Sequence, residues 1–182
     1  MKRFLTIFIY IVFFVSILEA SVTGRISISE EIAYQRYNRT WETPEYQYFS
    51  VESIALNPNF ECNLDFLFRG IGGITVGTEF GYQTSIDDMN RFVTFPKNIN
   101  GTVCSGFIIN IKSLRISVEA LLRSSFLLTR NSWISQIGGK AGFSYIFPCG
   151  LYLDMYFKYL NSYRMVTSSV AVGVGYQFGD KK

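Results

Sequence analysis

The chain has 182 residues, enough for one domain, and combines 48% hydrophobic and 17% aromatic residues with only four prolines, which argues against intrinsic disorder. Its formal net charge is +3 and it has no basic run, so a nucleic-acid partner is not predicted. It contains no histidine, the side chain that most often serves as a general base in enzymes.

The first 20 residues have the organisation of a signal peptide. Lys2 and Arg3 form a charged start, an apolar run follows over 4–18, and Ala20 offers a small residue for cleavage. The run is shorter than the ~20 residues that a helix needs to cross a bilayer, although an uncleaved signal anchor stays an alternative. We therefore expect an exported protein whose mature domain is 21–182, and no later run is long and apolar enough for a helical span.

The range 53–68 shows a period of two, which indicates a long β-strand with two unlike faces. One face carries Ile54, Leu56, Pro58, Phe60, Cys62, Leu64, Phe66 and Phe68. The other face is mostly polar and includes Glu61 and Asp65. A strand of this length with one purely apolar face predicts lipid on one side and a polar interior on the other.

Seven further segments show the same alternation. The eight expected strands are 24–37, 53–68, 74–84, 103–112, 114–123, 133–147, 151–159 and 169–178. The first is the least regular, because Glu30 interrupts the apolar phase of Ile28 and Ile32, and a bulge or a start inside a polar vestibule would explain it.

Short and long connections alternate along the chain. The short ones are 70–73, 112–113 and 148–150, and the longer polar loops include 38–51 and 85–102. Short turns at one end and longer loops at the other, joining segments of about ten alternating residues, are typical of outer-membrane barrels.

Alternation alone leaves open which face points outward, because a soluble lipocalin-like carrier has the same period with its apolar face inside. Three features favour the membrane. Glycines gather on the polar face, where they make room in a narrow interior: Gly77, Gly81, Gly138, Gly142, Gly173 and Gly175. Aromatic residues gather near both ends of the apolar faces, as the two interfaces of a bilayer select. The Gly-x-Trp motif of lipocalins and a helix after the strands are both missing.

These features resemble the small eight-stranded outer-membrane barrels of the OmpX, OmpA-transmembrane-domain and OmpW type. The resemblance covers nearly all of the mature chain and includes an aromatic-ended last strand with Tyr176 and Phe178, followed here by four further residues. It implies an all-β, antiparallel up-and-down barrel in the outer membrane. It also implies that the last strand is recognised by the insertion machinery, and, for the OmpW type, a passive conduit for small molecules.

On this assignment the barrel lumen holds five cationic and six anionic side chains. They are Arg25, Arg115, Arg123, Lys140 and Lys158, with Glu31, Glu61, Asp65, Glu79, Glu119 and Asp154. An eight-stranded barrel is only just wide enough for its own side chains, and unpaired charge there would cost several kcal/mol per ion. We therefore expect the charges to pair across a closed lumen, with an ion path as the alternative.

Enzymatic readings find little support. Barrels that deacylate or acylate lipids in this membrane use a histidine base with a serine, and the chain has no histidine. Glu61 and Asp65 have the residue types for acid–base work on a sugar, but pairing with Arg or Lys in a packed lumen accounts for them better. Three cysteines, Cys62, Cys104 and Cys149, show no metal-ligand spacing, and no cofactor is predicted.

The sequence therefore predicts a non-enzymatic outer-membrane barrel that supports envelope structure and displays loops to partners, such as host or envelope ligands. The aromatic residues of the first long loop are the candidates for partner binding: Trp41, Tyr46, Tyr48 and Phe49. A small-molecule conduit and, less well supported, a secreted carrier are the alternatives.

Overall fold

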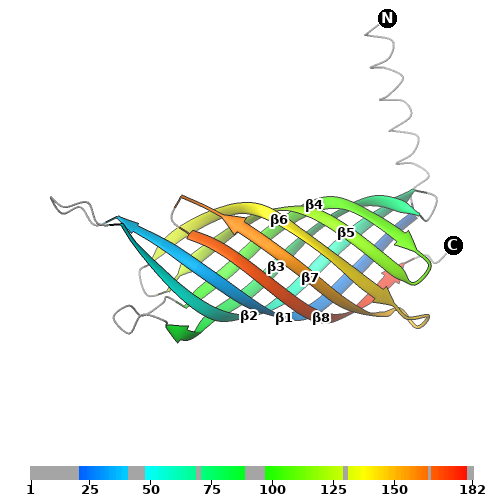
Figure 1. Ribbon diagram of the computed structural model, residues 1–182. Helices are drawn as coiled ribbons and strands as arrows, with labels where there is room; N and C mark the ends of the chain where they lie inside the picture. Colours follow the sequence, from blue (N-terminus) through cyan, green and yellow to red (C-terminus); the bar gives the residue numbers. More distant parts are fainter. Residues whose placement is uncertain are drawn as a thin grey trace, which may run out of the picture.

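The computed structural model describes residues 21–40, 48–68, 71–88, 97–128, 131–163 and 165–179. Within them, eight antiparallel strands form one closed barrel in which each strand pairs with its sequence neighbours and the last pairs with the first (Figure 1). The strands are β1 Ser21–Thr40, β2 Tyr48–Phe68, β3 Gly72–Asp88, β4 Asn98–Ile111, β5 Leu114–Leu127, β6 Ser132–Ile146, β7 Leu151–Asn161 and β8 Met165–Gly179. The expected signal peptide, 1–20, lies outside the described residues. A search of the described part of the chain found no helix with the length and hydropathy of a membrane span.

Of the eight described strands, all except β6 are longer than the sequence pattern predicted. The expected loop 38–51 is wrong at both ends, because β1 continues to Thr40 and β2 begins at Tyr48. The expected loop 85–102 is likewise shortened by β3 and β4. Near this loop end the outward positions become polar: Arg36, for instance, pairs in register with Glu52. Hydrophobic alternation stops there while backbone pairing continues, and the β1–β2 hairpin projects beyond its neighbours (Figure 1).

A bulge, one of the two explanations for the irregular first strand, is not present in β1. Strand β1 pairs without a register shift with β2 on one side and with β8 on the other, straight through Glu30. The irregularity lies instead between β2 and β3, at Ile54 and Ala55. Glu30 therefore keeps the phase of its apolar neighbours, and its side chain is exposed on the outward face.

The barrel is apolar on its outer face and charged on its inner face, which is the reverse of a soluble protein. Large apolar side chains point outward from the strands, with Phe80 and Val118 each 60% exposed. Charged side chains point inward, and Asp65 and Lys158 are completely buried. A carrier with an interior apolar cavity would need Phe60 and Phe80 inside, and both are exposed, so the carrier alternative does not fit.

Glycines on the inner wall make room for large polar side chains, as the sequence pattern predicted. A Cβ atom on Gly77 would collide with the side-chain amide of Asn63, and one on Gly175 would collide with the ring and hydroxyl of Tyr152. Tyr152 in turn donates a hydrogen bond to the carbonyl of Ile26, at 3.1 Å. The lumen is therefore packed, with small and large residues matched across neighbouring strands.

Candidate functional site: the ion-paired lumen

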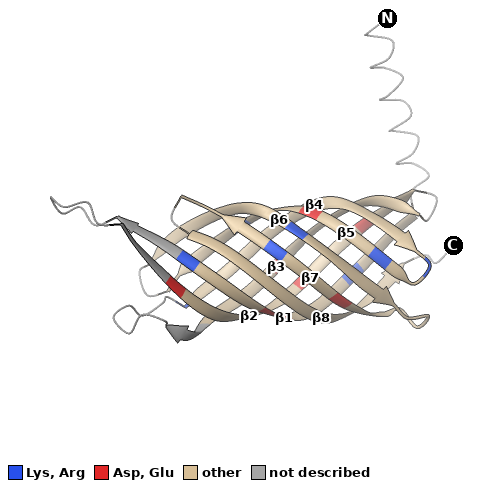
Figure 2. Cartoon of the chain, viewed as in Figure 1, with Lys and Arg blue, Asp and Glu red and all other residues tan. Residues whose placement is uncertain are grey.

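The described lumen contains all eleven of the charged residues expected there. Ten are nine-tenths or more buried, and Asp154 is half-buried. Charged residues occur on many strands along the barrel (Figure 2). The eleven lumen residues form a cluster near the turn end, where the short hairpin turns are, and a larger one in the centre.

The turn-end cluster is built around Asp65 of β2. Its Oδ2 lies 2.8 Å from Nε of Arg25 on β1, and its Oδ1 lies 2.6 Å from Nη2 of Arg115 on β5. The guanidinium of Arg25 also stands over the ring of Tyr152, 5.6 Å from its centroid, within the range of a cation–π contact. Asp154 accepts a hydrogen bond from the side chain of Ser144.

The central cluster joins three cations to four carboxylates. The ammonium of Lys140 lies 2.6 Å from Glu61 and 3.3 Å from both Glu79 and Glu119. That of Lys158 lies 2.6 Å from Glu79 and 3.0 Å from Glu31. Arg123 completes the set, 3.4 Å from Glu31 and 3.9 Å from Glu79. Each cation of this cluster has at least two carboxylates within ion-pair distance.

Two pairs of like charges are neighbours along the wall and face each other across the lumen, whereas Glu119 lies directly beside the oppositely charged Lys140. Glu61 pairs in register with Glu79, and Lys140 with Lys158, an arrangement that is unfavourable on an isolated sheet. However, β2 and β6 are four strands apart in a closed ring of eight, as are β3 and β7. The two glutamates therefore meet the two lysines only when the barrel closes, so these charges favour the closed form over an open sheet.

Sequence reasoning missed the neutral side chains that complete this network. The amides of Asn57 and Asn59 donate to Glu31, at 3.2 and 2.9 Å, and the amide of Asn63 donates to Glu61. The ring of Tyr156 lies beside the ammonium groups of Lys140 and Lys158, 5.0 and 4.7 Å from its centroid. The signal was available, because these residues share the inward phase of the charged ones.

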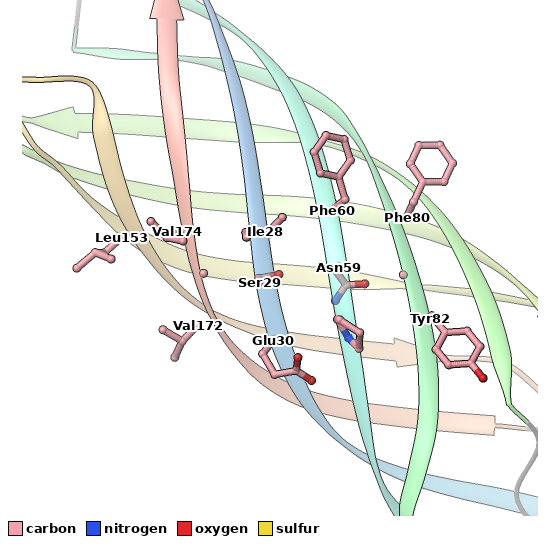
Figure 3. A pocket seen from close by; sticks show the side chains of 13 residues that line it. Ile28, Ser29, Glu30, Asn59, Phe60, Phe80, Tyr82, Leu153, Val172 and Val174 are labelled. Carbon is pink, nitrogen blue, oxygen red and sulfur yellow. The ribbon is translucent and has the colours of Figure 1, made fainter.

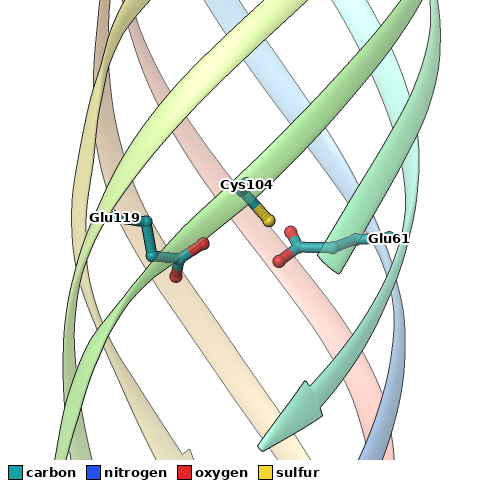
Figure 4. A group of neighbouring side chains, drawn as sticks. All are labelled: Glu61, Cys104 and Glu119. Carbon is teal, nitrogen blue, oxygen red and sulfur yellow. The ribbon is translucent and has the colours of Figure 1, made fainter. Parts of the chain in front are cut away.

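One group of lumen side chains has the composition of a metal site. Ligand atoms of Glu61, Cys104 and Glu119 all lie within 4.8 Å of one another (Figure 4). The ammonium of Lys140, however, already lies within 3.3 Å of a carboxylate oxygen of each glutamate. The lysine supplies the positive charge that the two carboxylates require, so the geometry favours a structural ion pair here.

The carboxylates considered for acid–base chemistry belong to different clusters. Asp65 is held by two arginines at the turn end, and Glu61 by Lys140 in the centre. Both are at least 95% buried. A saccharide has no room between them, and the arrangement serves packing and charge balance.

The other predicted residues belong to the first long loop and to the last strand. Trp41 and Tyr46 lie outside the described residues, whereas Tyr48 and Phe49 are the first two residues of β2. Tyr176 and Phe178 lie on β8 with their rings outward, 45% and 50% exposed. Phe178 covers Gly24 of β1, where a Cβ atom would collide with its ring, so this aromatic packs across the seam that closes the barrel.

No protein-family model matches the sequence, and no curated protein resembles it in sequence. Solved structures share its fold. The attachment invasion locus protein Ail of Yersinia pestis is 11% identical, with a TM-score of 0.51 over 87% of this chain and 99% of that one. Neisserial surface protein A is 9% identical, with a TM-score of 0.55 over 85% and 97%. The outer membrane protein AlkL is 7% identical, with a TM-score of 0.52 over 90% and 92%. The predicted fold of a small eight-stranded outer-membrane barrel is confirmed.

Proposed function

We propose that the protein is exported through a cleaved signal peptide and resides in the outer membrane as a non-enzymatic barrel with a closed lumen. Its role is to support envelope structure and to present its long loops to partners. The observation that carries this proposal is the pairing of an apolar outer wall with an ion-paired, buried interior.

The outer wall supports the membrane location. Apolar side chains such as Ile28, Phe107 and Val118 are 60% or more exposed, and in water this surface would promote association. Aromatic pairs stand near both ends of the strands: Phe126 with Trp133, and Tyr145 with Phe147, each with ring centroids 5.0 Å apart. Two aromatic belts flanking an apolar band are the arrangement that a bilayer selects.

The lumen supports the closed state. Lys158, Arg123 and Arg115 are among the largest almost completely buried side chains, and their charged ends lie in the ion-paired clusters of the lumen. Opening a path through the lumen would separate paired ions that are buried away from water. Each buried ion left unpaired would cost several kcal/mol. The protein therefore braces the membrane without conducting.

The loop role rests on the projecting β1–β2 hairpin and on four aromatic residues of this part of the sequence, Trp41, Tyr46, Tyr48 and Phe49. Aromatic side chains supply much contact area at low entropic cost. Ail bears the name of an attachment protein, which is consistent with partner binding through loops on this fold.

Extraction and electrophoresis test the membrane assignment. The mature protein should require detergent for extraction and should migrate differently on gels before and after boiling, because a folded barrel resists unfolding by detergent. A protein that is soluble without detergent and shows no heat-dependent shift would contradict the proposal.

Conductance separates the closed barrel from the small-molecule conduit. Purified barrel inserted into planar bilayers should show no steady channel. A steady open channel would overturn the closed-lumen proposal and favour the conduit, while leaving the membrane location intact.

A further inference from the structure

Glu30 has no role in the proposed function, and its position is unusual. It lies on the outward face of β1 between Ile28 and Ile32, which are 62% and 57% exposed. Its register partners on the neighbouring strands are Pro58 and Val172. Among the described side chains, it is the one charged group surrounded in this way by outward apolar residues.

The depth of Glu30 places its carboxylate well inside the apolar band. At roughly 3.3 Å per residue and a strand tilt of about 40°, Glu30 is separated along the barrel axis by ~10 Å from Tyr34 at the loop end. It is separated along the same axis by ~20 Å from Val22 at the turn end. Lipid tails offer no hydrogen-bond donor at that depth, and lipid head groups lie at the interfaces. Ionisable groups inside a membrane generally pair with a protein group, so the missing donor points to another membrane protein.

The same wall carries a suitable donor. Tyr82 of β3 is outward and 39% exposed, and it lies beside Pro58, because Asn59 pairs in register with Gly81. Among the described residues, neither the Glu30 carboxylate nor the Tyr82 hydroxyl has a hydrogen-bond or ion-pair partner. With neighbouring strands ~4.8 Å apart and tilted, Tyr82 lies roughly 6 Å closer to the loop end than Glu30, a difference that the tyrosine side chain can span.

An open groove of about 840 Å³ runs over this wall, and both Glu30 and Tyr82 line it (Figure 3). Its lining also includes Phe60, Phe80 and Val172. Pro58 of β2 lies on the groove between Glu30 of β1 and Tyr82 of β3. The β2–β3 ladder skips Asn57 and Pro58 and continues in the same register at Asn59. Aromatic side chains beside a recess are typical of the cores of protein interfaces.

We propose that this groove is the interface of a symmetric homodimer in the membrane, with the twofold axis passing near Pro58. Copies inserted by the same route have the same orientation, so the axis runs along the membrane normal and preserves depth. Tyr82 of each copy then donates a hydrogen bond to Glu30 of the partner subunit. A twofold interface uses the same patch on both copies, and this patch carries one donor and one acceptor on opposite sides of Pro58.

Disulfide cross-linking tests the geometry. In a chain whose native cysteines are replaced by serine, Pro58→Cys should cross-link two copies in lipid bilayers, since the axis brings the two positions together. Val118→Cys, outward on β5, is the matched control and should not cross-link. Cross-linking of both variants to the same extent, or of neither, would overturn the proposal.

Oligomer mass in lipid nanodiscs tests the chemistry. The unmodified chain and Glu30→Gln, which keeps an acceptor oxygen, should be dimers, whereas Tyr82→Phe and Glu30→Leu should shift at least tenfold towards monomers. Equal dimerisation of all four, or monomers throughout, would overturn the proposal. The groove would have another occupant if a lipid or a different protein co-purified with the unmodified chain but not with a monomeric Glu30→Leu variant. That result would also overturn the dimer proposal.

The proposal rests on the membrane location put forward above, and the two fail separately. The heat-dependent gel shift of each variant reports whether the barrel is formed, independently of its oligomeric state. A folded monomer that requires detergent would therefore contradict the dimer proposal and leave the proposed membrane location intact.

Discussion

Lys158 is completely buried, and its ammonium depends on two carboxylates. It lies 2.6 Å from Glu79 and 3.0 Å from Glu31, and the central cluster already contains one carboxylate more than its cations. Breaking a buried pair by removing one partner is much more costly than removing both, because the partner left behind stays buried and charged. We therefore expect that replacing a second, oppositely charged partner recovers part of the stability lost by replacing the first.

We predict that Lys158→Met lowers the free energy of unfolding by about 3–5 kcal/mol, since four carboxylates then face two cations. Adding Glu79→Gln should recover part of this loss, because it restores an excess of one negative charge. The measurement is denaturant unfolding in lipid vesicles. Lys112→Met, in an exposed turn, is the control and should change stability by less than about 0.5 kcal/mol. Additive losses in the double variant would contradict the coupled network.

Two adjacent glycines on β6 show how tightly a strand fits its neighbours. A Cβ atom on Gly138, which faces inward, would collide with the carbonyl oxygen and backbone of β7 at Tyr159 and Leu160. A Cβ atom on Gly139, which faces outward, would meet only the carbonyl oxygen of Glu119, at 3.5 Å. The first contact is with backbone, which cannot move aside without disturbing the β6–β7 pairing.

Gly138→Ala should therefore destabilise the barrel by about 1–3 kcal/mol, as overpacking does. Gly139→Ala should be neutral or slightly stabilising, because alanine restricts the unfolded chain. Both can be compared by denaturant unfolding in the same vesicles. Equal effects at the two positions would mean that the inner wall is looser than the structure indicates.

The strand pattern could be predicted where one face contacts lipid and the other the lumen, because a period of two then alternates apolar and polar residues. It failed beyond the apolar band, as at 38–40 and 85–88, where most residues are polar and backbone pairing alone defines the strand. Which lumen charges share a cluster could not be predicted either. The contact between Lys158 and Glu31 joins residues 127 positions apart, and it depends on strand stagger, which alternation does not encode.

Strand β8 offers a test of recognition during assembly. Phe178 and Phe157 are both outward and are 50% and 49% exposed, but only Phe178 belongs to the aromatic end of the last strand. If insertion machinery reads that end, Phe178→Ala should reduce the amount of folded barrel in cells several-fold, whereas Phe157→Ala should not. Refolding of both purified variants into detergent should succeed equally. A refolding defect confined to Phe178→Ala would instead assign the ring a purely structural role at the β1–β8 seam.

The barrel as a whole depends on its surroundings to separate apolar from polar surface. Its exterior requires lipid, and its charged interior requires closure, since the pairs between β2–β3 and β6–β7 exist only in the complete ring. We therefore expect closure of the barrel and its insertion into lipid to occur together. A label on either face of the barrel should report on both events. The chain contains natural positions for such labels.

The three cysteines occupy three different environments. Cys149 is exposed in the turn before β7, Cys62 is half-buried on the outward face, and Cys104 is buried in the lumen beside Asn63. We predict that a water-soluble maleimide labels Cys149 in the folded protein and labels Cys104 only after unfolding. Maleimide dissolved in water reaches the exposed thiol of Cys149. The packed lumen excludes the reagent from Cys104.

Single-cysteine variants labelled while unfolded and then refolded into vesicles extend this test to the direction of each face. A fluorophore on Cys62 should permit folding and should be quenched by lipids with brominated tails, because this position contacts the bilayer. A fluorophore on Cys149 should permit folding with little quenching. The same fluorophore on Cys104 should prevent folding, because the lumen at this point is filled by Leu121 and Leu160. If the Cys104 conjugate folded and the Cys62 conjugate did not, the polar and apolar faces would have to be exchanged, and both the closed lumen and the lipid-facing groove around Pro58 would fall with that assignment.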